Sequence, residues 1–114
     1  MTKRCLLILI SLAISTNLFA APSVSGRKAV AAAGTAERLT STSAWCNILT
    51  VTAFEANTDI VAVGASTVDA TESTRNGLVL FAGQTEYISG RTDIKDVWVD
   101  SEVNGEGVTY NCLN

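Results

Sequence analysis

The sequence predicts an all-β protein: an antiparallel β-sandwich or jelly roll of about eight short strands that follows an N-terminal signal peptide. Three observations support this prediction. Short β-prone runs recur about every 8–12 residues, which is typical of sandwiches and barrels. Clusters of Gly, Asn, Asp and Ser separate these runs and mark turns. Beyond the N-terminal segment, no stretch has the apolar periodicity of a convincing amphipathic helix.

Residues 1–20 have the organisation of a secretory signal peptide. Lys3 and Arg4 give a basic start, an apolar part follows from Cys5 to Ile14, and the small residue Ala20 precedes a polar stretch. The apolar part is shorter than the roughly 20 residues that a helix needs to cross a bilayer. We therefore predict export, with cleavage after Ala20. Retention of the segment as an N-terminal anchor is the alternative.

Removal of the signal peptide would leave an acidic chain. Residues 21–27 are small and polar and are expected to form a flexible lead-in, and residues 28–114 a single β-sandwich domain. The chain has 8 Lys+Arg and 11 Asp+Glu, so loss of Lys3 and Arg4 leaves 8 − 2 = 6 against 11, a net charge of −5. No basic stripe is present to attract phosphates, so we expect no nucleic-acid partner. A membrane is a partner only if the N-terminal segment is retained.

The first half of the domain is expected to contain four strands. Alanines around Val30 would suit a helix, but this β-branched residue and the following Gly34-Thr35 favour a strand and a turn. The clearest run has Leu49, Val51 and Ala53 facing one way and Ile48, Thr50, Thr52 and Phe54 facing the other, the period of a half-buried strand. The expected strands are Lys28–Ala32, Glu37–Thr40, Asn47–Phe54 and Asp59–Val63.

The second half is read from its turns. Asn76-Gly77 and Asn104-Gly105 are strong hairpin signals because both residue types accept positive φ. The segment 104–107 is predicted to join the last two strands directly, and Ala82-Gly83-Gln84 makes another tight turn. The polar segment 66–75 is expected to be an exposed loop. The expected strands are Leu78–Phe81, Thr85–Ser89, Asp96–Asp100 and Gly107–Cys112.

Cleavage after Ala20 would also leave an even number of cysteines, Cys46 and Cys112. In an oxidising compartment such a pair predicts a disulfide. The bond would close a separation of 112 − 46 = 66 residues, which is worth about 4 kcal/mol in the chain-entropy model. Two buried free thiols are the alternative. A zinc site is disfavoured because no histidine is present to complete it.

The residues for most kinds of catalysis are missing from the sequence. It has no histidine, so Ser-His-Asp and Cys-His machinery cannot form, and it has no phosphate-binding or dinucleotide-binding glycine motif. Asp93, Asp96, Asp100 and Glu102 alternate with apolar residues and are interpreted as a solvated strand face that protects an edge. Calcium ligation is the alternative for these carboxylates. We expect a protein that is not an enzyme and has no cofactor and no metal site.

Trp98 raises the question of a binding surface. If Val97 and Val99 point into the core, Trp98 points outward and, with Asp96 and Asp100, forms a candidate interface. If the parity is reversed, Trp98 anchors the core. Trp45, beside Cys46, is expected to pack over the disulfide. The small number of aromatic residues argues against a groove dedicated to stacking sugars.

Turn and strand motifs follow one another in a fixed order across about residues 28–112. They are Gly34-Thr35-Ala36 with Leu39, Thr50-Val51-Thr52-Ala53, Asn57-Thr58, Val63-Gly64, Gly77-Leu78-Val79-Leu80, Ala82-Gly83-Gln84, Val97-Trp98-Val99-Asp100 and Val103-Asn104-Gly105-Glu106-Gly107-Val108-Thr109-Tyr110. This series resembles small β-sandwich virion proteins of bacteriophages: capsid-decorating, head-fibre or spike-like modules. The resemblance implies a structural role and brings no catalytic residues. The signal peptide departs from the pattern, because tailed-phage heads assemble in the cytoplasm.

These observations together predict a non-enzymatic structural or adsorption module of a phage virion, exported to the periplasm, the exterior or the virion surface. Its expected partners are other virion proteins or a component of the host surface, and it is expected to form a homo-oligomer. The alternative is a periplasmic or secreted bacterial binding module for a small ligand, peptide or glycan. A deep apolar cleft would favour the alternative, and a flat sandwich with exposed Trp98 would favour the virion module.

Overall fold

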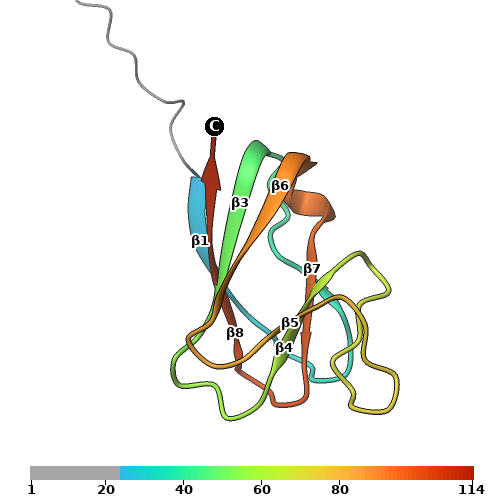
Figure 1. The fold of residues 1–114 in the computed structure, drawn as a ribbon. Helices are drawn as coiled ribbons and strands as arrows, with labels where there is room; N and C mark the ends of the chain where they lie inside the picture. The colour runs from blue at the N-terminus through green and yellow to red at the C-terminus, as the bar shows by residue number, and fades with distance from the viewer. Residues whose placement is uncertain (1–23) are drawn as a thin grey trace, which may run out of the picture.

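The computed structural model describes residues 24–114, so the predicted signal peptide lies outside the described residues. Each of the expected strands overlaps an observed strand, which confirms the all-β prediction (Figure 1). Within residues 24–114, no helix is long and apolar enough to cross a membrane. The elements are β1 (Val24–Ala29), β2 (Glu37–Arg38), β3 (Trp45–Ala53), β4 (Val61–Gly64), β5 (Leu78–Leu80), β6 (Thr85–Asp93), the 3-10 turn η1 (Ile94–Asp96), β7 (Trp98–Ser101) and β8 (Gly107–Leu113).

The strands form two four-stranded antiparallel sheets. Sheet A has the order β1-β8-β3-β6 and sheet B the order β2-β7-β4-β5. The pairs are nested, since β1 pairs with β8, β2 with β7, β3 with β6 and β4 with β5. The first four strands therefore pair in reverse order with the last four, and the resulting long hairpin folds into two packed sheets. This is the jelly-roll arrangement. Figure 1 shows the first and last strands side by side.

The core lies between the inner faces of the two sheets. On β3 the predicted alternation is confirmed, because Leu49, Val51 and Ala53 are buried and Ile48 is exposed. Val97 and Val99 are also buried. Full burial of a side chain of this size contributes about 1.5–3 kcal/mol, so these apolar residues are the main source of stability. The other members of the core cluster are Val30, Leu39, Cys46, Val61, Val63, Leu80, Ile94, Val108 and Cys112.

A second, smaller apolar cluster covers the outer face of sheet B. The loop 65–77 folds back over β4 and β7, and its Val68 and Ala70 are buried against Ala62 and the partly buried Trp98. The prediction of an exposed loop at residues 66–75 is therefore wrong at these two positions. In the sequence, polar residues surround Val68 and Ala70, and two apolar positions are too few to give a periodic pattern.

The boundary of the first strand also differs from the prediction. β1 begins at Val24, and Val24 to Lys28 pair in unbroken register with β8. Residues 24–27 therefore form a strand and not a flexible lead-in; residues 21–23 lie outside the described part. Small polar residues have little strand preference of their own, but pairing with β8 supplies hydrogen bonds that local sequence cannot reveal.

Two predicted direct turns connect different sheets. The segment 104–107 leads from β7 in sheet B to β8 in sheet A, and residues 82–84 lead from β5 in sheet B to β6 in sheet A. Gly83 and Gly105 do have positive φ, as the turn chemistry requires. The tight turn at residues 82–84 is confirmed by the hydrogen bond from the Gln84 amide to the Phe81 carbonyl. The hairpin prediction at Asn104-Gly105 is wrong, because a tight reversal does not determine which sheet receives the next strand.

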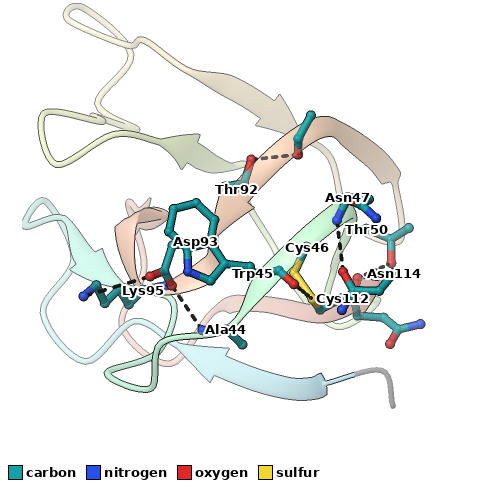
Figure 2. Close-up of a disulfide and its surroundings, with 12 residues drawn as sticks. Ala44, Trp45, Cys46, Asn47, Thr50, Thr92, Asp93, Lys95, Cys112 and Asn114 are labelled. Atoms are coloured by element: carbon teal, nitrogen blue, oxygen red, sulfur yellow. Dashed lines mark hydrogen bonds and ion pairs between the residues drawn. A yellow bond between two sulfur atoms is a disulfide. The ribbon is translucent and has the colours of Figure 1, made fainter. Parts of the chain in front are cut away.

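The predicted disulfide is present between Cys46 of β3 and Cys112 of β8 (Figure 2). The two Cα atoms are 5.2 Å apart, and both side chains are buried in the core. Trp45 does not pack over the bond, contrary to the prediction, because adjacent residues of a strand point to opposite faces. Its side chain is 51% exposed and lies under the guanidinium of Arg91, 5.1 Å from the ring centroid.

Two carboxylates add side-chain contacts to those made by strand pairing. Glu37 of β2 binds the Lys28 ammonium of β1 at 2.8 Å and so links the edges of the two sheets. Burial acts to raise the pKa of Glu37, but hydrogen bonds from the Ala32 amide and Lys28 lower it overall. Asp93 accepts hydrogen bonds from the Ser43 hydroxyl and the amides of Ala44 and Lys95. The Ser43 hydrogen bond is the main cause of its lowered pKa.

These two carboxylates predict loss of stability in acid. A pKa that is lower in the folded state stabilises the protein above the ordinary pKa, about 4.5 for Glu37 and 3.8 for Asp93, and this contribution is lost as the pH falls through the folded value. We expect the urea midpoint to be constant from neutral pH to about pH 5 and to fall below it. The double variant Glu37→Gln/Asp93→Asn should show a shallower decline; an equal decline in both proteins would contradict this assignment.

Candidate functional site

The two sheets differ in what covers their outer faces. The outer face of sheet B lies under the loop 65–77, whereas no described segment covers that of sheet A. We call the outward-pointing side chains of sheet A the open face. Strand register and the alternation of burial identify them as Ser25 and Arg27 of β1, Thr109, Asn111 and Leu113 of β8, Ile48, Thr50 and Thr52 of β3, and Thr85, Tyr87 and Ser89 of β6.

Hydroxyl and amide side chains occupy the middle of the open face. Thr109, Thr52 and Thr85 lie in one row across three adjacent strands, and the hydroxyl oxygens of Thr52 and Thr85 are 2.8 Å apart. In the next row, the Thr50 hydroxyl donates to the Asn111 carbonyl at 3.2 Å. None of the side chains in the open face carries a carboxylate, so the face is polar without negative charge.

Aromatic rings lie at both ends of the open face and between them. At one end Phe54 lies under the guanidinium of Arg27, 3.8 Å from the ring centroid. At the other end Trp45 lies under Arg91. Tyr87 stands between them on the edge strand β6 and is 68% exposed. The face therefore presents rings and cations at separated points of a hydroxyl-rich surface.

A shallow hollow of about 430 Å³ adjoins the Arg27 end of this face. Its lining includes Arg27, Thr52, Phe54 and Thr109 from the sheet, and the loop residues Glu55, Asn57 and Glu106. A second hollow of about 410 Å³ lies on the other side of Asn57 and includes Ile60 and Phe81. Neither is the deep apolar cleft that would favour a dedicated small-molecule site.

The buried polar side chains beside these hollows hold the loops together. The Glu106 carboxylate accepts hydrogen bonds from the amide and hydroxyl of Thr58 and from the Asp59 amide. The Asn57 side chain donates to the Gly107 carbonyl and accepts from the Gly107 amide. Because these polar groups already have partners within the chain, their role is to fix the β3–β4 loop against the start of β8.

The candidate interface predicted around Trp98 is not one exposed surface. Asp100 is 1% exposed; it accepts hydrogen bonds from the Gly34 amide at 3.1 Å and the Ala70 amide at 2.8 Å. Asp100 is therefore a buried structural residue and not an interface residue. The interpretation of Asp93 and Asp100 as solvated is wrong, because each caps backbone amides of a neighbouring loop or turn.

Trp98 is neither a fully exposed interface residue nor an anchor of the main core. It points outward from sheet B, since Val97 and Val99 face the core, but the cluster around Val68 covers part of it. The Arg38 guanidinium lies 4.8 Å from its ring centroid. Asp96 is exposed, with a 3.8 Å ion pair to Arg38. Of the three predicted residues, only Asp96 is exposed.

The basic side chains fall into two groups: those with a carboxylate or carbonyl partner, and those that lie over aromatic rings of the open face. Within residues 24–114, Lys28, Arg38 and Lys95 pair with carboxylates, and Arg75 donates to the Ala70 carbonyl. The remaining two are the arginines that lie over aromatic rings at the ends of the open face. No ion pair joins either of these to a carboxylate of the described chain. The open face is therefore a local region of positive charge on an acidic protein.

Sequence reasoning found one strip of the open face and missed the rest. The outward parity of Ile48, Thr50 and Thr52 is visible in the sequence, but only strand pairing places Thr109 and Thr85 beside Thr52. No group of three or more cysteine or acidic side chains in the described part of the chain is arranged to hold a metal ion. The chain matches no protein-family model, no curated protein and no solved structure.

Proposed function

We propose that this protein is a non-enzymatic structural or adsorption module of a phage virion, exported or envelope-associated, that docks through the open face. The observation that carries the proposal is the difference between the two sheets: one outer face is covered, and the other displays exposed Ile48, Tyr87 and Leu113 next to Trp45. Large exposed apolar side chains that gather on one face are typical of interaction surfaces.

Two further features support the proposal. Jelly rolls occur among viral capsid domains, so the fold agrees by analogy with the resemblance to small virion proteins. The disulfide Cys46–Cys112 fits assembly in an oxidising compartment, outside the cytoplasm. The partners of this module are other virion proteins or a component of the host surface, and copies of the module associate with one another through exposed strand edges.

The binding-module alternative is favoured by one observation, the hollow beside Arg27 and Phe54. Its volume falls within the range of ligand pockets. In that case, binding of a small ligand would depend on Arg27 and Thr109 and would be insensitive to changes at Trp45, at the far end of the face. The virion module instead needs the whole face.

The proposed function predicts binding to virions or host cells. The full chain is expressed with export, and the exported product is purified. Its mass, measured by mass spectrometry, locates the N-terminus. The purified protein is then incubated with virions and, separately, with host cells. We expect saturable binding that the double variant Ile48→Ser/Tyr87→Ser loses. Phe81→Ser is the matched control, because Phe81 is 66% exposed but lies outside the open face. A protein that stays monomeric and binds neither virions nor cells would refute the proposal.

A further inference from the structure

The two arginines on the open face indicate what kind of partner it accepts. Arg27 and Arg91 have ring contacts but no carboxylate partner in the described chain. The carboxylates that line the adjoining hollow, Glu55 and Glu106, belong to loops outside the sheet. Glu106 is buried and hydrogen-bonded within the chain, whereas Glu55 is exposed. The charge of the open face is therefore complementary to an anion.

The side chains between the arginines indicate a sugar-rich anion. Threonine hydroxyls and the Asn111 amide donate and accept hydrogen bonds, which matches the many hydroxyl groups of a carbohydrate. Aromatic rings offer flat apolar faces against which sugar rings can stack. The number of aromatic residues argued against a sugar-stacking groove, but the fold brings Trp45, Phe54 and Tyr87 onto one flat face.

A second copy of the chain fits the open face less well. Two such faces would bring arginines together without any carboxylate to offset them, and like charges in contact are unfavourable. The centres of protein interfaces are enriched in apolar area. Here the centre consists of Thr50, Thr52 and their neighbours, and the large apolar side chains stand toward the margins.

The dimensions of the open face favour a chain over a single sugar. Arg27 of β1 lies in the row of Thr52, near the end of β3. Arg91 of β6 lies over Trp45, at the start of β3. The rise of about 3.4 Å per residue places the two ends of the face roughly 20 Å apart. An occupant that contacts both arginines must extend across several rows of side chains.

We propose that the open face binds an acidic polysaccharide of the bacterial surface, one that carries carboxylate groups along its chain. The inference rests on the proposed adsorption function and names the class of molecule that adsorption recognises. Arg27 and Arg91 bind carboxylates at the two ends, Tyr87 stacks against a sugar ring, and the threonine rows bind hydroxyl groups. Charge-assisted hydrogen bonds from arginine to carboxylate are the strong contacts.

The test measures binding of the exported, purified protein to immobilised alginate, with dextran as the neutral probe. We expect binding to alginate that added salt weakens, and none to dextran. Arg27→Gln and Arg91→Gln should each weaken alginate binding about tenfold, and Tyr87→Ala should weaken it as well. Arg38→Gln is the matched control, because Arg38 also lies over a tryptophan but on the other sheet. Glu55→Gln removes a carboxylate from the hollow beside Arg27 and should strengthen binding.

Several outcomes would overturn the glycan proposal. Equal binding to both polymers, binding to neither, or equal loss in Arg38→Gln and Arg27→Gln would each do so, the last because it indicates charge attraction without a defined site. Cell binding that survives periodate but is lost after protease treatment of the cells would identify a protein partner. That result would leave the docking function intact, whereas failure to bind cells or virions at all refutes the docking function itself.

Discussion

Removing the disulfide with Cys46→Ser is expected to lower the melting temperature on the order of 15–30 °C. The bond joins residues 66 positions apart, and loss of a loop constraint of that length costs about 4 kcal/mol in the chain-entropy model. Each kcal/mol corresponds to about 4–8 °C in a domain of this size. Differential scanning calorimetry of the two proteins measures the shift directly.

Two controls separate the bond from the side chains. The double variant Cys46→Ala/Cys112→Ala should melt close to Cys46→Ser, because the bond is absent from both. Reduction of the native protein should produce most of the same shift. Once cleavage after Ala20 has removed Cys5, the native protein should also show no thiol that reacts with a thiol reagent after denaturation. A melting temperature that reductant does not change would contradict the stabilising role of the bond.

Asp100→Ala is expected to cost about 1–3 kcal/mol of unfolding free energy. The carboxylate accepts hydrogen bonds from the amides of Gly34 and Ala70. Alanine would leave the buried Ala70 amide without its partner, which costs about 1–3 kcal/mol, whereas the Gly34 amide keeps its 3.0 Å hydrogen bond to the Ser101 carbonyl. Urea denaturation monitored by tryptophan fluorescence measures the change, since Trp98 lies on the same strand.

The neighbouring carboxylate Asp96 gives the matched control. Its side chain is 66% exposed and 3.8 Å from the Arg38 guanidinium, and exposed ion pairs contribute at most about 1 kcal/mol. Asp96→Ala should therefore have little effect. Similar losses in the two variants would mean that the amide contacts of Asp100 are not what holds the loops 30–36 and 65–77 in place.

The sequence predicted the strands better than the way they pair. Alternation around Leu49 and Val51 determines which side chains are buried, so the strand and its inner face follow from local pattern alone. The alternation of side chains along the strand could not predict whether Trp98 and Asp100 are exposed. Both point outward from sheet B, and a loop that is distant in the sequence then covers them. The partners of Asp100 lie 66 and 30 residues away in the chain.

The candidate site, too, could be predicted only as far as the local pattern of single strands allows. The outward strip of β3 could be read from the sequence, and Tyr87 and Thr109 each fall in a predicted strand. Their assembly into one face depends on β8 lying between β1 and β3, and on β6 at the far edge. Turn chemistry at Gly83 and Gly105 marked the reversals of the chain but carried no information on which sheet would receive the next strand.

The nested pairing of strands also sets the order of events during synthesis. Apart from β4 and β5, no strand pairs with its neighbour along the chain. β3 must wait for β6, β2 for β7, and β1 for β8, which is the last of the described strands to be made. Such distant pairing is associated with folding on a millisecond to second scale. Neither the complete sheet A nor the disulfide can form until β8 has been synthesised.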